Sequence, residues 1–305
     1  MRALNVLVYH RVLAERDPLL AGEPTVSEFE ARMRWVASNY DVLPLLDAVR
    51  ALRAGRLPAR ALSITFDDGY ADNYENALPV LRRLSLPATF FIASGFLDGG
   101  CMFNDVVIEA VRRAATAELE LDDLGLGCHP LGATELRARA IDRILSQLKY
   151  FEPARRAHVA AQIAERAGAR APTDLMMTST QVRAVAQSGM AVGAHTVTHP
   201  ILAGIPLERA REEMSADRAR LEQITAAPVR LFAYPNGTPL RDYRPEHAAL
   251  ARELGFEGAV STARGAARPG DDPFQIPRFT PWDSANWRFG LRLATKRLSS
   301  TYARA

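Results

Sequence analysis

The chain has 305 residues, of which 48% are hydrophobic, with a formal net charge of +3 and a pI near 9.0. This length and composition exclude a disordered or fibrous protein and allow one large α/β domain or two smaller ones. The basic residues are almost all arginine and form no compact block interleaved with aromatics, so we expect no nucleic-acid partner.

Predicted strands and helices alternate along the chain. Short apolar or β-branched runs, typical of buried parallel strands, occur at 5–9, 61–66, 88–93, 190–195, 230–235 and 258–262. Between them lie helical patterns at 26–38, 73–84, 178–189 and 207–224. Ser27 and Glu30 have capping-box spacing in the first of these. The alternation predicts a parallel sheet and, at this length, a closed or nearly closed barrel.

One region, between about 100 and 177, breaks this alternation. It has helical patterns and no convincing strand, so we expect a helical insertion between two strands of a single domain that spans residues 1–305. The helix expected at 207–224 has Ala210, Met214 and Leu221 on one face, and Asp217 falls on the same face.

The N-terminal sequence predicts a first strand rather than a signal peptide. Tyr9 and His10 interrupt its apolar run early, and no small-residue cleavage site follows. No apolar run approaches the roughly 18 residues of a membrane-spanning helix. Cys101 and Cys128 form neither a metal-type pair nor a disulfide framework. We therefore expect a cytoplasmic protein without an integral membrane segment, although the basic and partly apolar tail leaves peripheral membrane association open. The sequence does not indicate the oligomeric state.

Two adjacent aspartates, Asp67 and Asp68, follow the run at 61–66. Neighbouring carboxylates near a core repel each other and lose hydration, so something positive is expected beside them. Catalytic groups of a parallel barrel collect at the C-terminal ends of its strands. His195 and His199 end another run and, on a helical turn, their spacing would place two imidazoles on one face. With one carboxylate they form a set suited to a catalytic divalent metal such as Zn²⁺.

The motifs TFDDGY and HTVTHP resemble the first two signature motifs of the polysaccharide deacetylases, the NodB-homology proteins of carbohydrate esterase family 4. The resemblance covers most of the chain. It implies a distorted (β/α)7 barrel and a metal-dependent hydrolase that removes N-acetyl groups from sugars of a polysaccharide or glycan precursor. By position, Asp67 corresponds to the general base, and Asp68, His195 and His199 to ligands of a divalent ion. The resemblance favours Zn²⁺, with Co²⁺, Ni²⁺ or Mn²⁺ as alternatives.

The chain departs from the family pattern at two places. Most relatives carry an Arg-x-Pro-Tyr motif whose Arg orients the base, and here Ala233 stands at that position. Arg278 is the replacement we expect, the alternative being an arginine on a solvated loop. Tyr234 still offers its backbone N–H to a developing oxyanion, as the equivalent position does in the family. The family's late histidine is absent, and His10 resembles the early histidine of a rearranged exopolysaccharide subgroup. We expect His10 to be the general acid, against a plain core histidine.

The segment at 102–111 resembles one that borders the substrate cleft in exopolysaccharide-cluster deacetylases. We expect Asn104 to contact substrate there, although an ordinary helix N-terminus explains the same residues. Two other functions fit parts of the pattern. A carbohydrate-binding pseudoenzyme would account for the missing arginine and late histidine. A non-haem iron oxygenase would use the same two-His, one-carboxylate set, but it leaves the paired aspartates unexplained.

Overall fold

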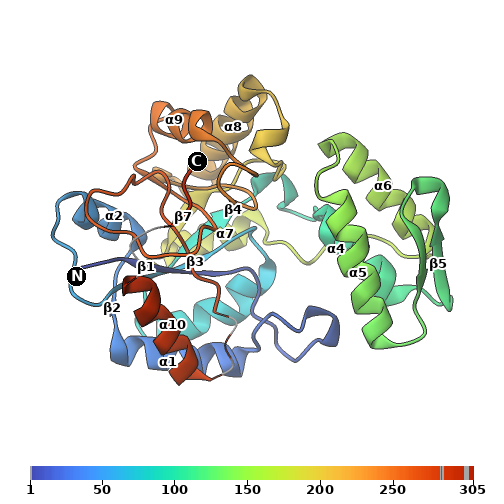
Figure 1. Ribbon diagram of the computed structural model, residues 1–305, viewed down its shortest axis with the longest axis horizontal. Coiled ribbons are helices and arrows are strands. Elements are labelled where there is room, and N and C mark those ends of the chain that lie inside the picture. Colours follow the sequence, from blue (N-terminus) through green and yellow to red (C-terminus); the bar gives the residue numbers. More distant parts are fainter. Residues whose placement is uncertain (1, 282, 284, 299–301) are drawn as a thin grey trace. The chain divides into compact units, whose positions relative to one another are not determined.

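The structure is a computed structural model that describes residues 2–281, 283, 285–298 and 302–305 (Figure 1). The chain divides into two compact units. Unit 1 comprises Met1–Glu15, Gly22–Leu97 and Met177–Ala305, and unit 2 comprises Arg16–Ala21 and Asp98–Met176. None of the described helices is long and apolar enough to cross a membrane.

Unit 1 is built from parallel strands and the helices between them. Its strands are β1 (Asn5–Tyr9), β2 (Asp41–Val42), β3 (Ala61–Phe66), β4 (Thr89–Ile92), β7 (Ala191–Ala194), β8 (Leu231–Ala233) and β9 (Gly258–Val260). Its α-helices are α1 (Val26–Asn39), α2 (Leu45–Arg53), α3 (Leu78–Arg83), α7 (Ser179–Gln187), α8 (Leu207–Thr225), α9 (Pro245–Glu253) and α10 (Asn286–Leu298). Short helical turns lie at η2 (Asn73–Ala77), η3 (Ser94–Phe96) and η5 (Leu202–Gly204). All six predicted strands are present.

The sheet runs in the order β1-β3-β4-β7-β8-β9, with β2 beside the start of β3, and every pair is parallel. The segment 276–279 bonds to both outer strands. Ile276 N donates to the Ala259 carbonyl of β9 at 3.0 Å, and Phe279 N donates to the Val6 carbonyl of β1 at 2.8 Å. The sheet therefore curls on itself with helices around it (Figure 1), which confirms the distorted (β/α)7 barrel.

Apolar side chains fill both sides of this curled sheet. Outside, Phe66 and Phe90 stack with ring centroids 4.7 Å apart, within a cluster that also contains side chains of α1, α7 and α8. Inside, the fully buried Phe91 belongs to a cluster with Leu231 and residues of α2. A Cβ on Gly193 would lie 2.4 Å from the Phe91 ring, so glycine is required where β7 passes this aromatic side chain.

The start of α1 differs from the sequence prediction. Thr25, not Ser27, is the N-cap: its hydroxyl accepts from Glu28 N, and the Glu28 carboxylate accepts from Thr25 N at 2.8 Å. A hydrogen bond from Val26 N to the Leu13 carbonyl, 2.9 Å long, accompanies a parallel bridge at Thr25. The chain is therefore extended up to Thr25, and the helix begins directly after it.

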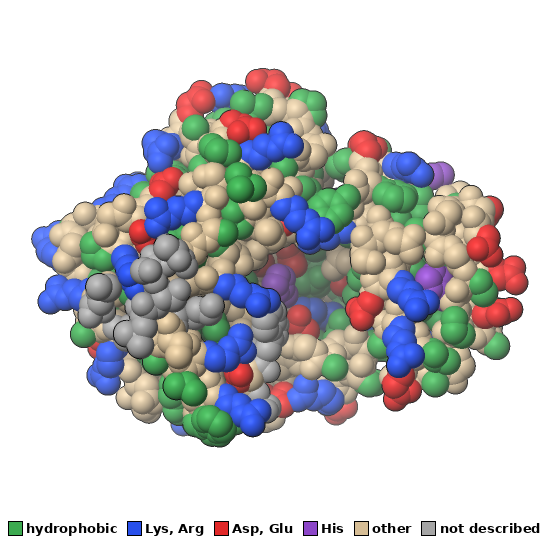
Figure 2. Space-filling model, in the orientation of Figure 1, with side chains coloured by type: hydrophobic (Ala, Val, Ile, Leu, Met, Phe, Trp, Pro, Cys, Tyr) green, Lys and Arg blue, Asp and Glu red, His purple; other side chains and the backbone are tan. Residues whose placement is uncertain are grey.

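Unit 2 contains a β-hairpin as well as helices. Its elements are η1 (Pro18–Leu20), α4 (Phe103–Arg113), β5 (Glu118–Leu121), η4 (Asp122–Leu124), β6 (Gly127–Pro130), α5 (Thr134–Leu148) and α6 (Pro153–Arg166). The expectation of helices alone was wrong, because β5 and β6 pair antiparallel. Leu119 and Leu121 are buried while Glu118 and Glu120 are exposed. Figure 2 shows acidic side chains gathered at the edge of unit 2 where this hairpin lies.

Candidate active site

The paired aspartates lie in a tight turn at the C-terminal end of β3. Gly69 N donates to the Asp67 carbonyl at 3.0 Å, and Asp68 between them has φ +75°. Asp67 itself continues the strand, since its N–H donates to the Tyr9 carbonyl of β1 at 2.9 Å. A γ-turn with positive φ is strained for a non-glycine residue. It frees the two neighbouring carboxylates from the strict alternation of a strand, and each meets a different partner.

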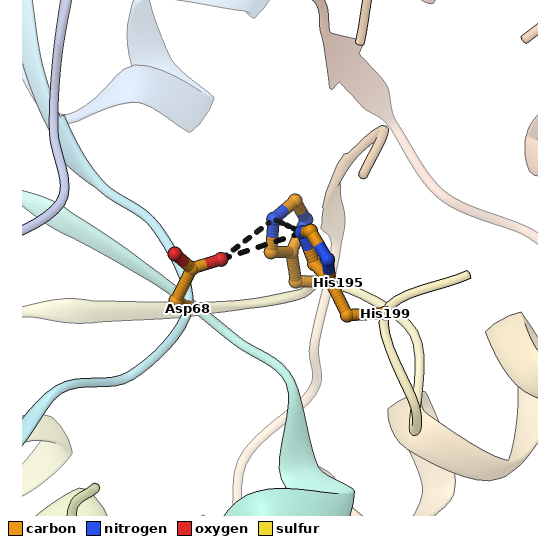
Figure 3. A group of neighbouring side chains, drawn as sticks. All are labelled: Asp68, His195 and His199. Atoms are coloured by element: carbon orange, nitrogen blue, oxygen red, sulfur yellow. Dashed lines mark hydrogen bonds and ion pairs between the residues drawn. The ribbon is translucent and has the colours of Figure 1, made fainter. Parts of the chain in front are cut away.

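Asp68 meets both histidines. Its Oδ1 lies 3.4 Å from Nε2 of His195 and 3.4 Å from Nε2 of His199, and the two nitrogens are 3.2 Å apart. Figure 3 shows the three side chains pointing toward one another. These ligand atoms all lie within 4.8 Å of one another, and Asp68 and His195 are buried. The arrangement is that of a two-His, one-carboxylate site with room for further ligands.

The proton on His195 is fixed by a second contact. Its Nδ1 lies 2.7 Å from the Ala233 carbonyl of β8. Because a carbonyl oxygen only accepts, Nδ1 carries a proton, so a neutral ring at this position would have the lone pair on Nε2, the atom that faces Asp68 and His199, free for a metal ion. Metal-ligating histidines usually have such a carbonyl partner, so the donor set fits a divalent ion.

The two histidines do not lie on a helical turn, which corrects the sequence prediction. The segment 195–200 is an irregular loop after β7, with φ +66° at Thr196 and φ +51° at His199. These left-handed residues turn the chain back so that the second imidazole faces the first, with ring centroids 4.7 Å apart. The spacing of four residues brings the rings together by a mechanism other than helix periodicity.

Asp67 meets Arg278 in a fully buried, bidentate ion pair. Nη1 and Nη2 of Arg278 lie 2.7 Å from Oδ1 and Oδ2 of Asp67, and the two residues are 1% and 3% exposed. Nε of the same guanidinium donates to the Ser261 carbonyl at 3.0 Å. Nη1 also donates to the Thr65 hydroxyl at 3.3 Å. The arginine therefore lies inside the barrel, not on a solvated loop.

The electrostatics of the two acids follow from these partners. Burial alone would raise the pKa of Asp67, but the Arg278 charge, with help from His195, lowers this pKa below its ordinary value. Burial opposes ionisation of Asp68 too, yet its hydrogen bond to His195 and the nearby His199 hold its pKa well below the usual range. Both carboxylates are thus ionised at neutral pH, side by side, without a shared proton.

His10 follows β1 at the same edge of the sheet and is half-buried. Electrostatic attraction from its imidazole contributes to the lowered pKa of both Asp67 and Asp68. The backbone is tethered here, because Asn73 Nδ2 donates to the His10 carbonyl at 2.8 Å. Asp72 accepts from the next two residues, from Arg11 Nε at 2.8 Å and from Val12 N at 3.2 Å.

Tyr234 does not present the N–H that the sequence analysis assigned to an oxyanion. Its N–H donates to the Val260 carbonyl at 3.2 Å, within the pairing of β8 with β9, and its hydroxyl donates to the Phe274 carbonyl at 2.9 Å. The residue is fully buried, so both donors are committed to the fold. Asn104 is the second residue of α4 in unit 2, and its contact with substrate stays a prediction.

Sequence reasoning missed two buried acids of α8 that contact the histidine loop. Asp217 accepts from His195 N at 2.8 Å and from Ser94 N at 3.0 Å. Glu213 accepts from the N–H and the hydroxyl of Thr198, each at 2.8 Å. A signal was present, because an acid on the apolar face of a helix must find a buried partner.

Comparison with known proteins agrees with this geometry. The family described as polysaccharide deacetylase matches residues 54–259. The chain belongs to this family. YxkH of Bacillus subtilis (strain 168) is 22% identical over 266 residues, which cover 87% of this chain and 66% of YxkH. The poly-beta-1,6-N-acetyl-D-glucosamine N-deacetylase of Staphylococcus epidermidis is 31% identical over 145 residues, 43% of this chain and 49% of that protein. The aligned regions thus span about two thirds and about half of the lengths of these relatives.

Solved structures of deacetylases share the fold of this chain. IcaB from Ammonifex degensii has a TM-score of 0.62 at 19% identity, covering 96% of this chain and 98% of that chain. The Streptococcus pyogenes deacetylase PplD, solved with acetate, has a TM-score of 0.60 at 18% identity, covering 91% and 92%. Both similarities extend over most of the chain, so the curled parallel sheet is the fold of these deacetylases.

Proposed function

We propose that this member of the polysaccharide deacetylase family is a metal-dependent N-deacetylase that hydrolyses the acetamide of N-acetylated sugars in a polysaccharide or glycan precursor. The observation that carries the proposal is the pairing at the end of β3. One aspartate, Asp68, faces two imidazoles, and its neighbour Asp67 is held by a buried guanidinium.

Asp68, His195 and His199 would hold the divalent ion, and Zn²⁺ is the ion we expect. Two imidazole nitrogens and one carboxylate are ligands that Zn²⁺ binds readily, and three protein ligands leave positions for water and substrate. A bound ion would polarise the acetamide carbonyl and lower the pKa of water at the site. Co²⁺, Ni²⁺ and Mn²⁺ are alternatives that accept the same donors.

Asp67 would act as the general base. Its carboxylate, kept ionised by Arg278, accepts a proton from the attacking water at one of its Oδ atoms while the water oxygen bonds to the acetyl carbon. Each Oδ atom retains a lone pair beside its hydrogen bond to the guanidinium. Arg278 would therefore take the orienting role that other members give to the arginine replaced here by Ala233.

His10 would act as the general acid. As the C–N bond breaks, the imidazolium donates a proton to the leaving sugar nitrogen, and the products are acetate and a free amine. The support is its place directly after β1, the strand that pairs in parallel with β3, and the tether of its backbone to Asn73.

Relatives guide the choice of substrate. Proteins from Staphylococcus epidermidis and Staphylococcus aureus that share part of this sequence carry the name poly-beta-1,6-N-acetyl-D-glucosamine N-deacetylase. Oligosaccharides of β-1,6-linked N-acetylglucosamine are therefore the first substrates to test, beside other N-acetylated glycans and sugar nucleotides.

The test is acetate release by the Zn²⁺-loaded protein, measured with variants of the two aspartates. Asp67→Asn is expected to retain Zn²⁺ and lose acetate release, whereas Asp68→Asn is expected to lose both. Asp47→Asn, at an exposed position on α2, is the matched control and is expected to keep both.

Three results would contradict the proposal. Acetate release by Asp67→Asn at the parent rate would remove its role as base. Tight glycan binding without turnover by the parent, with each of several divalent metals, would identify a carbohydrate-binding pseudoenzyme. Turnover that requires Fe(II) and O₂ would identify an oxygenase.

A further inference from the structure

The loop that carries the two histidines is held in place by contacts from neighbouring elements. It comprises residues 195–199. The backbone groups of His195, Val197 and Thr198 form hydrogen bonds with η3 or with side chains of α8. Two of these contacts end on carboxylates of α8 that are almost fully buried. Neither carboxylate has a part in the proposed reaction. Their burial against this loop therefore points to a role in holding its conformation.

The loop needs external support because its backbone is strained. Thr196 has φ +66°, although a β-branched residue in the left-handed region is a clear outlier. His199 has φ +51°. Such conformations persist only where the surroundings over-determine them. Without support, the loop would relax and the second imidazole would turn away from the first.

Asp217 holds the first end of the loop. It is fully buried, and its two oxygens accept from His195 N at 2.8 Å and from Ser94 N at 3.0 Å. The carboxylate thus ties the end of β7 to the end of β4. Each of its two oxygens accepts from one N–H donor. An asparagine at this position would therefore place its NH₂ group against one of these two N–H donors.

Glu213, one helical turn earlier on α8, holds the other end. It is 3% exposed, and its two oxygens accept from Thr198 N and Thr198 Oγ1, each at 2.8 Å. Between the two acids, Gly95 N donates to the Val197 carbonyl at 2.8 Å. A Cβ on Gly95 would lie 2.4 Å from that carbonyl oxygen, so the approach requires glycine.

We propose that Glu213 and Asp217 are positioning residues that clamp the histidine loop and set the distance between the two imidazoles, and so the affinity of the site for its metal. The clamp rests on the metal site of the proposed function, but not on the reaction or the substrate. The two acids are spaced four residues apart on α8, as are His195 and His199 on the loop, so one helix face holds both ends of the loop.

The experiment is Zn²⁺ binding, measured by competition with a chromophoric chelator, on the full chain and three variants. Glu213→Gln and Asp217→Asn keep the size of each side chain. The amide at 217 puts an NH₂ group against a backbone N–H, and the amide at 213 removes the negative charge that accepts from Thr198 and Arg209. Thr198→Val removes the hydroxyl that donates to Glu213. Thr198 is exposed, so we expect this variant to fold. Contacts behind metal ligands typically contribute 10–100-fold to affinity. We expect Zn²⁺ to bind about 10–100-fold more weakly to the two acid variants and several-fold more weakly to Thr198→Val.

A second readout separates positioning from stability alone. The visible absorption of the Co²⁺-loaded protein reports ligand geometry, and we expect it to change in the acid variants. Glu208→Gln is the matched control, because this acid on α8 has a side chain that is 78% exposed and contacts Arg211 at the surface. It is expected to leave both the Zn²⁺ affinity and the Co²⁺ spectrum unchanged. Near-UV circular dichroism establishes that each variant is folded.

The results of these measurements distinguish failure of the clamp from failure of the proposed function. Weaker Zn²⁺ binding with a changed Co²⁺ spectrum in folded Glu213→Gln or Thr198→Val supports the clamp, even where Asp217→Asn does not fold. Parent-like affinity in these folded variants refutes it while leaving the proposed deacetylase intact. A parent chain that binds no Zn²⁺ refutes the metal site and the clamp together. Normal metal binding without acetate release from any glycan refutes the proposed function alone.

Discussion

Replacement of Arg278 by methionine removes the cation that holds Asp67. The guanidinium is 1% exposed and the carboxylate 3% exposed, so water cannot take its place. Deleting one partner of a buried ion pair costs about 3–5 kcal/mol, because the remaining charge stays buried and unpaired. The variant also leaves the Ser261 carbonyl without the donor at 3.0 Å. Methionine fills much of the vacated volume with a flexible apolar chain, which limits any cavity.

The measurement is urea denaturation at pH 7 of Arg278→Met, Asp67→Asn and the double variant. We expect Arg278→Met to lose about 3–5 kcal/mol of unfolding free energy. The double variant should be less destabilised than the sum of the two single variants, since a neutral asparagine needs no cation. A coupling of about 1–3 kcal/mol is typical of residues in one buried network.

A surface pair provides the control. Arg50 makes a bidentate contact to Glu257 with the same chemistry, but its side chain is 50% exposed. Exposed pairs contribute about 0–1 kcal/mol, so Arg50→Met should be nearly neutral. If Arg278→Met were as mild as Arg50→Met, or if the coupling with Asp67 were near zero, burial and pairing would not be what holds the base.

Three further changes test other parts of the structure. Gly193→Ala puts a Cβ 2.4 Å from the Phe91 ring, so it should lower stability by about 1–3 kcal/mol in a thermal melt; an unchanged melting temperature would mean that the ring is not fixed there. Glu257 has its pKa lowered from 4.5 to about 2 by Arg50 and Arg230, so its contribution is present above pH 4.5 and is lost as pH falls toward 2. Glu257→Gln should therefore cost about 1 kcal/mol at pH 7, after allowance for solvent screening, and less at pH 3; an equal cost at both pH values would contradict the ion pair. Zn²⁺ at 100 times its dissociation constant should stabilise the parent by about 2.7 kcal/mol, and a similar rise in melting temperature in Asp68→Asn would exclude that residue as a ligand.

The strands of the barrel could be predicted because each is a run of apolar or β-branched residues bounded by turn signals. Their order and the closure by 276–279 could not be read from such runs, because closure depends on hydrogen bonds between segments far apart in the chain. The hairpin of unit 2 was missed for a local reason. Its strands are four residues long, and Glu118 and Glu120 are residue types that strands disfavour.

The candidate site, like the fold, could be predicted from the sequence only in part. The residues of the metal set lie in short motifs, and their types alone suggested the chemistry. The conformation of the histidine loop had no such signal, because positive φ at Thr196 goes against the preference of a β-branched residue. Arg278 could be named only as the residue to fill a missing role. Its partner lies 211 positions earlier, a separation across which periodicity carries no information.

The geometry at the end of β3 explains how two neighbouring aspartates are ionised together. In a regular strand, successive side chains point to opposite faces, and only one of the pair would reach the barrel interior. Asp67 follows that rule and meets Arg278 inside the barrel. Positive φ at Asp68 breaks the rule and turns the second carboxylate to His195 and His199. Each acid therefore has its own positive or metal-binding partner, so neither needs the other's proton. A substitution that removed the turn but kept both aspartates, such as a β-branched residue at Gly69 with its φ of +94°, should disable the site without changing any ligand.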